Sequence, residues 1–420
     1  MTSPLFRGLE KALLAKSSAC TLDIDRARPH RVGVALWLLC IVVMATAHNG
    51  HAAVLPEDRV DVLYHSYDGG GAEISGPSVL VRKGVANTVS VYANYYVDEV
   101  TGASIDVDLV AGATTYQEER TEYSLGLDYL YDKTIMSLSY SSSTENDYEA
   151  ETVSFGISQD FFGDLTNVSL GFSLGNDTVR RNEDLDPGDT PFEDEAEHRR
   201  YSVGISQILT KSFILALNFE TVVDEGYLSN PYRQVRFVDN SVARGFSLEP
   251  ELYPRTRNSD AYGIRGMYYL PYRASLRAEY RALSDSWGIS ADSVELRYIH
   301  PIEQLNLTLE GKYRVYDQTE ANFFDDLFPF RNVNGVEFRA RDKEMSAFTT
   351  DTIGLGISYE LPPNWIPFME KSSINLYWDH IQFDYEQFRD HRDPEALEAG
   401  AEEFYSFNAN VIRFFFSFWY

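Results

Sequence analysis

The feature of this sequence that most restricts its fold is an alternation of apolar and polar residues that returns along most of the chain. Tyr123, Leu125, Leu127, Tyr129 and Tyr131 alternate with polar or small residues. Successive side chains of a β-strand point to opposite faces, so this period of two gives a strand one apolar and one polar face. Comparable stretches follow at residues 153–157, 168–174, 213–219, 305–315 and 353–359. The pattern predicts an all-β fold.

The connections between these stretches also alternate in length. Short links are predicted at residues 84–87, 132–133, 163–164, 210–211, 270–273, 301–304 and 361–371. The other connections are predicted at residues 68–76, 98–117, 142–147, 176–198, 223–260, 284–287, 317–345 and 386–405. Transmembrane β-barrels have short periplasmic turns and longer outer loops. We therefore expect an antiparallel up-and-down transmembrane barrel of about 16 strands, with 14 as the alternative, and both termini on the periplasmic side.

A soluble β-protein would alternate equally well, but the C-terminal strand argues against one. Five alternate residues there form one apolar face that runs to the end of the chain: Ile412, Phe414, Phe416, Phe418 and Tyr420. A soluble protein seldom exposes such a face. It resembles the signal by which outer-membrane barrels reach their assembly machinery, with Tyr420 where phenylalanine is usual. We expect location in the bacterial outer membrane, in contact with membrane lipid and lipopolysaccharide, and the barrel-assembly machinery as a partner.

Residues 1–52 are interpreted as a signal peptide with an N-terminal extension. Arg26, Arg28 and Arg31 precede an apolar run at residues 32–47, and small residues follow, which predicts cleavage after Ala52. A membrane anchor is the alternative, but the run is shorter than the roughly 20 residues of a spanning helix. The outer-membrane barrel with its acidic outer loops is then expected to occupy residues 53–420.

The composition excludes several classes of protein. With 44% apolar residues and a formal charge of −28, the chain is neither a helical membrane bundle nor a disordered polypeptide. The negative charge argues against nucleic acid as a partner. The two cysteines, Cys20 and Cys40, both precede residue 53. The barrel therefore has no disulfide, thiolate nucleophile or zinc-thiolate site.

Charged residues occupy the polar positions of three late strands and are predicted to face the lumen. They are Arg277, Glu279, Arg281, Glu295, Arg297, Glu310, Lys312 and Arg314. One interpretation is a selectivity or binding surface inside a pore. The other is that a wide lumen must be polar in any case, and that the mixed charges pair across the strands. The two interpretations have equal support at this point.

Acidic residues concentrate in two of the predicted outer loops. One loop contains Glu183, Asp184, Asp186, Asp189, Glu193, Asp194, Glu195 and Glu197, and the other contains Glu395, Glu398, Glu402 and Glu403. Such clusters can bind calcium or magnesium, but the spacing of a calcium-binding loop with its closing glutamate is missing. We expect solvated acidic loops.

The sequence gives no positive sign of catalysis. No pair among His65, His198, His300, His380 and His391 has metal-binding spacing. Asp379 and His380 are neighbours on a predicted strand, so they point to opposite faces and cannot form a dyad. Phosphate loops, dinucleotide fingerprints and haem-attachment motifs are absent from the sequence. We expect no cofactor, no bound metal and no enzymatic activity.

Several short motifs resemble a domain-of-unknown-function family of bacterial outer-membrane β-barrels found in proteobacteria and related groups. The motifs lie at residues 101–104, 123–134, 145–148, 158–164 and 226–233, and the resemblance extends over essentially all of residues 53–420. The resemblance implies the barrel fold, but no activity and no catalytic residues, because the family has none assigned. Genes for thioredoxin-like proteins, small lipoproteins and flavin transferases near those of its members hint at a periplasmic redox or maturation system.

Three functions follow, in order of preference. The first is a channel or transport-associated barrel with the charged lumen as the path. The second is a non-porous scaffold whose lumen is filled by loops or by a periplasmic or lipoprotein partner, in a surface redox or export module. The third is an enzyme that acts at the surface, which would require converging serine, histidine and acidic residues at the outer rim.

Overall fold

A computed structural model describes residues 53–102, 105, 109, 116–181, 191–362, 366, 368–393, 395–396 and 398–420. The predicted signal segment at residues 1–52 lies outside the described residues, as does the acidic run at 182–190. No helix in the described part of the chain is long and apolar enough to cross a membrane. The described residues form 18 strands and two short 3₁₀ helices.

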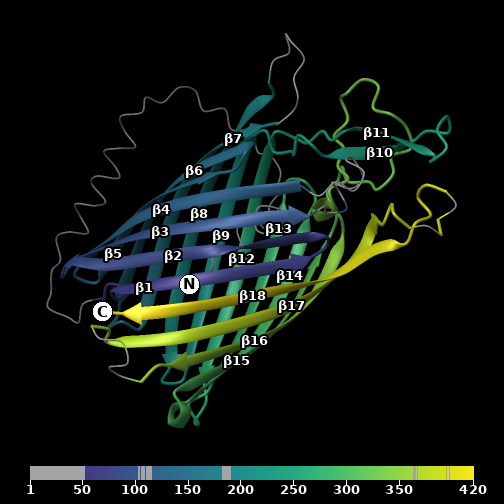
Figure 1. Ribbon diagram of the computed structural model, residues 1–420. Coiled ribbons are helices and arrows are strands. Elements are labelled where there is room, and N and C mark those ends of the chain that lie inside the picture. Colours follow the sequence, from purple (N-terminus) through teal and green to yellow (C-terminus); the bar gives the residue numbers. More distant parts are fainter. Residues whose placement is uncertain are drawn as a thin grey trace, which may run out of the picture.

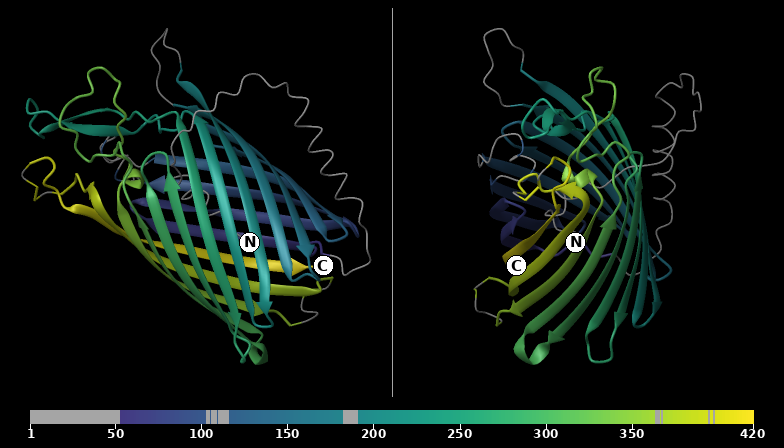
Figure 2. Two further views of the ribbon diagram at one scale, coloured as in Figure 1. Left: turned by 180° about the vertical axis from the view of Figure 1, so that it is seen from behind. Right: turned by 90° about the vertical axis from the view of Figure 1, so that its right-hand side faces the viewer.

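Sixteen of these strands form one closed barrel (Figures 1 and 2), which confirms the preferred strand number. The first nine are β1 (Arg59–Gly69), β2 (Ala72–Ala86), β3 (Val89–Gly102), β4 (Tyr116–Tyr131), β5 (Thr134–Thr144), β6 (Tyr148–Phe161), β7 (Thr166–Arg180), β8 (Glu193–Thr210) and β9 (Phe213–Gly226). The others are β12 (Thr256–Tyr269), β13 (Ser275–Asp285), β14 (Ser290–Ile302), β15 (Leu307–Gln318), β16 (Phe348–Glu360), β17 (Lys371–Arg389) and β18 (Phe404–Trp419). Neighbours are antiparallel, and β1 pairs with β18 to close the ring.

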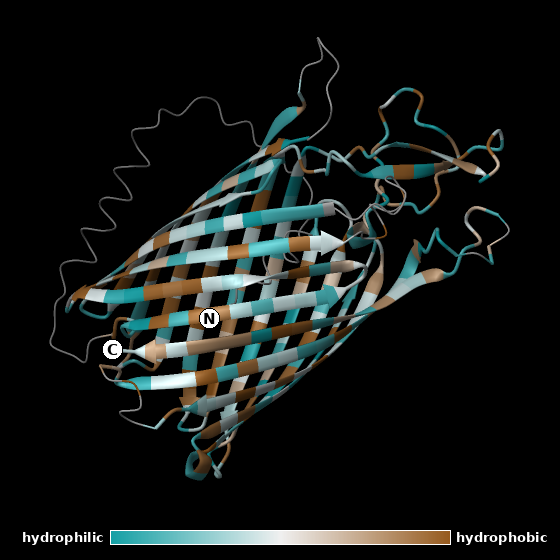
Figure 3. Cartoon of the chain, in the orientation of Figure 1, coloured by the Kyte–Doolittle hydropathy of each residue, from teal (hydrophilic) through white to brown (hydrophobic). Residues whose placement is uncertain are grey.

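The outside of the barrel is apolar because one side chain in two along the strands is apolar and exposed there. On β4, Leu125 is 60% exposed, and on β16, Ile353 and Leu355 are 54% and 56% exposed. Figure 3 shows the alternation of apolar and polar residues along the strands. Tyr123 and Tyr129, also exposed, bracket the apolar face of β4, as in the aromatic girdles of membrane barrels. This surface suits hydrocarbon rather than water.

The two ends of the barrel differ. The end that carries the C-terminus has the short connections, and we call it the termini end (Figure 1). The opposite end, the loop end, carries the longer connections, as the sequence predicts. The prediction is wrong at residues 68–76, where β1 and β2 continue until only Gly70 and Gly71 remain between them. Both glycines have positive φ angles, 62° and 83°, which suits a two-residue hairpin turn.

Three connections fold together at the loop end into a structure that we call the cap. Residues 227–255 contribute β10 (Gln234–Val238) and β11 (Phe246–Pro250), which pair outside the barrel. Residues 319–347, with the short 3₁₀ helix η2 (Lys343–Met345), and residues 390–403 complete it. Fully buried Arg236 forms ion pairs with Asp326 and, at 2.5 Å, with Glu402. Because these three side chains come from the three connections, they tie the cap together.

An aromatic cluster lies on the lumen side of β15 to β18 near the loop end. It contains Tyr316, Phe348, Phe383, Tyr385 and Tyr405. Ile105, from the connection between β3 and β4, is completely buried in this cluster. Ile105 therefore lies against the inner face of β15 to β18, and apolar packing occupies this part of the lumen.

Candidate functional site: the charged wall of the lumen

The structure turns the eight predicted charged residues away from the lipid-facing surface. On β13, Leu276 and Tyr280 are exposed on the outside, so Arg277, Glu279 and Arg281 point into the lumen. The same alternation on β14 and β15 turns the other five inward: Glu295, Arg297, Glu310, Lys312 and Arg314. The charges thus share one continuous surface of three neighbouring strands. Its use as a filter or binding surface stays a prediction.

Three more charged residues extend this surface. Arg265 on β12 lies 2.7 Å from Glu279, and Arg413 on β18 lies 2.9 Å from Asp379 on β17. We call the eight predicted residues together with these three the charged wall. The residues two positions before and after Arg265, Asp379 and Arg413 are uncharged, so no charged run marked these three in the sequence. The alternation of the last strand could have identified Arg413 as a lumen-facing residue, because Arg413 alternates with the apolar residues of that strand.

Like charges stand directly opposite one another in the charged wall. Arg277, Arg297 and Lys312 face each other in register across β13, β14 and β15, and we call them the basic row. Glu279 and Glu295 face each other in the adjacent register position. Like charges at directly opposed positions destabilise a sheet. A wall selected only for cross-strand pairing would place opposite charges at these positions.

Contacts along strands, along diagonals and, for Arg265 with Glu279, directly across two strands compensate the carboxylates. Arg277 lies 2.5 Å from Glu279, two residues further along the same strand. Arg297 lies 3.0 Å from Glu295 and 2.8 Å from Glu310. Every carboxylate of the charged wall therefore has a cation within 3.0 Å, Asp379 and Glu279 having two each.

One of these contacts crosses a whole strand. Lys312 on β15 and Asp379 on β17 both lie in register with Gly354 of β16, which stands between them. Their charged atoms are 2.7 Å apart. A Cβ atom on Gly354 would lie 2.2 Å from Asp379 Oδ1 and 2.7 Å from Lys312 Cε. The ion pair therefore depends on a glycine at this position.

The charged wall has a surplus of positive charge. Its seven basic residues outnumber its four acidic residues, although the whole chain is strongly acidic. Arg281 lies 3.3 Å from Glu220 on β9, outside the wall, and the Arg314 guanidinium lies 5.8 Å from the Tyr316 ring. Arg281 and Arg314 both lie toward the loop-end side of the basic row.

Small uncharged residues line the far side of the ring. The lumen-facing residues at mid-height on β5 to β8 are Ser137, Ser139, Ser141, Ser154, Gly156, Ser158, Ser169, Gly171, Ser173, Ser202, Gly204 and Ser206. Ser154 and Ser173 share a hydrogen bond of 2.7 Å. These side chains are too short to reach across a 16-strand barrel, whose lumen is wide enough for water. We call this surface the serine-glycine wall.

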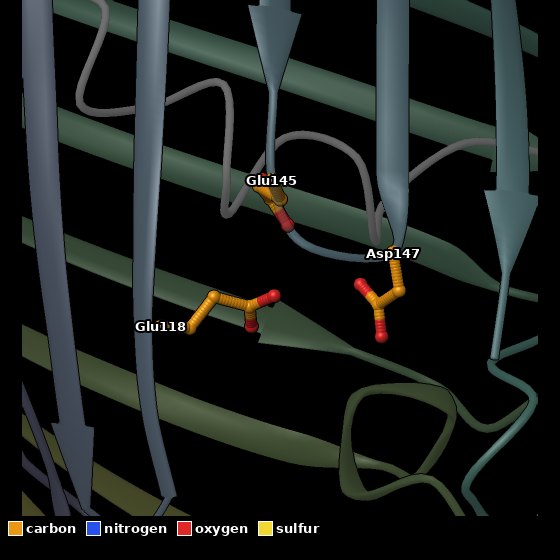
Figure 4. A group of neighbouring side chains, drawn as sticks. All are labelled: Glu118, Glu145 and Asp147. Carbon is orange, nitrogen blue, oxygen red and sulfur yellow. The ribbon is translucent and has the colours of Figure 1, made fainter. Parts of the chain in front are cut away.

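A group of three carboxylates lies near the loop end, and sequence reasoning missed it because its members come from separate segments. Figure 4 shows Glu118, Glu145 and Asp147, whose oxygen atoms lie within 4.8 Å of one another. The neighbours of Glu118 on the outer face, Gln117 and Glu119, are polar and exposed, so this section lies beyond the apolar band. Burial and the two nearby carboxylates raise the pKa of Glu118 to about 7. Such a group can share a proton or bind a hard cation.

His198 is held between two carboxylates. His198 Nδ1 lies 2.7 Å from Asp224, and its Nε2 lies 3.1 Å from Asp177. The outward neighbours of His198 are charged Glu197 and Arg199, which places it beyond the apolar band. Burial alone would lower the pKa of His198, but the two carboxylates outweigh it and raise the pKa to about 9. A protonated imidazole has no lone pair with which to act as a base.

Two other histidines also contact neighbouring side chains. His65 is buried, stacks on Tyr96 and lies 2.6 Å from Asp98. His380 contacts Asn410 at 3.1 Å on the outer face of β17, whereas Asp379 points into the lumen. Asp379 and His380 therefore cannot form a dyad, as the strand geometry predicts.

The predicted apolar face of the last strand lies on the outside of the barrel. Ile412 and Phe414 are exposed there at 43% and 37%. Phe414, Phe416 and Phe418 form consecutive ring contacts along the strand. The Tyr420 hydroxyl donates to the carbonyl oxygen of Arg82 at 3.1 Å, next to the seam between β1 and β18. The role of this face in targeting stays a prediction.

The described acidic loop residues are ion-paired more than the sequence suggests. Asp194 lies 2.7 Å from Arg255, and Glu193 lies 2.9 Å from Arg180. Glu402 is buried in the cap beside Arg236 rather than solvated, because the cap brings distant loops together. Burial alone would raise the pKa of Glu402, but the Arg236 guanidinium lowers it below its usual range.

These features define the class of protein: a closed antiparallel β-barrel with an apolar outer face and a polar, partly charged lumen, the architecture of bacterial outer-membrane barrels. More narrowly, the chain belongs to the family "Protein of unknown function (DUF3570)", whose model matches residues 110–368. This agrees with the resemblance seen in the sequence. No functionally curated protein matches the chain.

Solved structures with a similar fold are outer-membrane proteins. The siderophore receptor PirA from Acinetobacter baumannii is 12% identical with a TM-score of 0.44, and the match covers 84% of this chain and 57% of that one. The ferric citrate transporter FecA is 9% identical (TM-score 0.41; 87% and 79% covered). A FadL homologue from Pseudomonas aeruginosa is 9% identical (TM-score 0.39; 86% and 89% covered). The chain thus spans little more than half the length of the siderophore receptor.

Proposed function

We propose that this barrel is a channel or transport-associated barrel in which small polar solutes move through the lumen along the charged wall. The observation that carries the proposal is the placement of like charges opposite one another on the lumen face of β13 to β15. This arrangement costs stability, and a lumen that only needed to be polar could avoid it. Contact between these charges and a passing solute would be a functional reason for the arrangement.

The dimensions of the barrel support the proposal. Barrels of 16 to 18 strands enclose an aqueous channel when nothing fills them. Arg277, Arg297 and Arg413 retain 26%, 24% and 20% side-chain exposure although they face inward. The short side chains of the serine-glycine wall leave the lumen wide on the other side.

Conductance across a planar lipid bilayer tests the proposal. The purified, folded barrel is expected to give discrete openings, and a folded barrel that never opens would contradict it. Ser154→Trp places a large side chain in the lumen and should lower the conductance of each opening. Phe155→Trp is the matched control, because Phe155 is exposed on the outer face of the same strand and the current should stay unchanged.

A second candidate is a non-porous scaffold that holds a periplasmic or lipoprotein partner. The observation in its favour is Ile105, which is completely buried in the aromatic cluster on the lumen side. Co-purification from native membranes should then yield a stoichiometric partner with a closed pore. Isolation of the barrel alone, with an open pore, would dismiss this candidate.

The surroundings of the histidines support the expectation that the barrel is not an enzyme. His198 is held between two carboxylates, and His65 is buried in the barrel wall. Neither imidazole is placed to take a proton from a serine hydroxyl. Loss of a surface lipid or peptide substrate on incubation with the purified barrel would overturn this expectation.

A further inference from the structure

We propose that the charged wall selects anionic solutes and that the basic row binds their carboxylate or phosphate groups. This inference rests on the proposed function, because it requires that solutes reach the lumen. It names the chemical class of solute, which the channel proposal leaves open.

The first argument is the saturation of the carboxylates. Arg265 and Arg277 contact Glu279, Arg297 contacts Glu295 and Glu310, and Lys312 and Arg413 contact Asp379. Four carboxylates therefore face seven cations in the charged wall. A passing cation would have to displace an arginine or a lysine, whereas an anion meets a net positive surface.

The second argument is the geometry of the basic row. Arg277, Arg297 and Lys312 occupy directly opposed positions on adjacent strands, which lie about 4.8 Å apart. Their mutual repulsion falls when an anion lies between them. A guanidinium also binds carboxylate and phosphate oxygens in pairs, which favours oxyanions over spherical ions.

The third argument is that the protein's own carboxylate already lies at one end of the basic row. Asp379 lies 2.7 Å from Lys312, across the space that Gly354 leaves open, and 2.9 Å from Arg413 on the neighbouring strand β18. This arrangement shows that side chains at this height can converge on one carboxylate. A carboxylate on a solute offers Arg277 and Arg297 the same kind of ligand.

The position of the charged wall within the apolar band strengthens the selection of anions. Leu276, Leu296 and Tyr313, which alternate with wall residues, are exposed on the lipid side. The wall is therefore surrounded by hydrocarbon, and low-dielectric walls focus the field of lumen charges on the ions that pass. The acidic groups of the loop end lie outside this section, and salt screens them beyond about 8 Å at physiological ionic strength.

The reversal potential under a potassium chloride gradient tests the selectivity. The unaltered barrel should pass chloride in preference to potassium. Arg277→Gln combined with Arg281→Gln should lower the permeability ratio by at least about twofold. These two sites are chosen because Glu279 keeps Arg265, and Glu220 keeps Arg200 at 3.8 Å. Arg392→Gln, at an exposed cap residue, is the control, which should leave the chloride preference in place.

Block of the chloride current tests binding. Citrate and inorganic phosphate, added separately at millimolar concentration, are expected to reduce the current of the unaltered barrel. The same anions should reduce the current of the Arg277→Gln, Arg281→Gln double variant several times less. Block by one anion and not by the other identifies which oxyanion the basic row accepts.

The outcomes separate this inference from the channel proposal. Openings that favour potassium, or that favour neither ion, overturn the inference and leave the channel proposal standing. A chloride preference that survives the double variant also overturns it, because other residues then select. A folded barrel without openings contradicts the channel proposal itself.

Discussion

At the scale of single residues, period-two alternation predicts which side chains face the lumen but not which ones meet. The sequence alone places Arg277, Arg297 and Lys312 on lumen faces. It does not give the strand register that sets them directly opposite one another. It also cannot show that Gly354 leaves room for an ion pair between two strands that are not neighbours, because that contact depends on three strands at once.

Gly354→Ala is expected to destabilise the barrel by about 1–3 kcal/mol, the usual cost of overpacking a well-packed site. The new methyl group would push Lys312 and Asp379 apart. Urea-dependent folding into lipid vesicles measures the change in the free energy of unfolding. Gly311→Ala is the matched control, because a Cβ at Gly311 meets no atom within 4 Å. Equal effects of the two substitutions would show that the open space at Gly354 is not needed.

At the scale of elements, strands were predictable and their extensions were not. The hydrophobic pattern ends at the edge of the apolar band, whereas β7 and β8 continue beyond it on polar residues. The β10–β11 hairpin and the cap arise from contacts between loops far apart in sequence, such as Arg236 with Asp326 and Glu402. A charge pattern within one loop cannot reveal such contacts.

Arg236→Met is expected to loosen the cap while the barrel stays folded. The substitution leaves Glu402 buried without its arginine, and removing one partner of a buried ion pair costs about 3–5 kcal/mol. Limited trypsin digestion should then cut residues 227–255 or 390–403 faster, with the heat-modifiable gel mobility of the barrel unchanged. Arg331→Met is the control, since its side chain is 70% exposed. A cap as resistant as the unaltered one would show that Arg236 does not tie the loops together.

At the scale of the whole molecule, closure of the ring depends on the last strand. β18 pairs with both β1 and β17, so the C-terminal residues complete the barrel and also face the lipid. The alternation at Ile412 and Phe414 predicted this lipid face correctly. The predicted partner, the assembly machinery, is not visible in a single chain.

Phe414→Arg is expected to reduce the amount of folded barrel in the outer membrane of a Gram-negative host. A basic residue on the lipid face costs about 2–4 kcal/mol at the middle of the bilayer, and it also interrupts the predicted targeting face. Heat-modifiable gel mobility of the outer-membrane fraction measures the effect. Phe415→Arg should cost less, because Phe415 points into the lumen and stacks on Tyr377. A larger loss for Phe415→Arg would contradict the assignment of the two faces.

The serine-glycine wall makes the lumen asymmetric, with charged residues on one side and uncharged residues on the other. In the proposed channel, a solute would meet charge along one flank and serine hydroxyl groups and glycines along the other. An elongated solute with one ionised end would therefore travel with that end turned toward β13 to β15 and its uncharged body along β5 to β8. Orientation of this kind would discriminate between isomers of equal size and charge, which a symmetric pore could not tell apart.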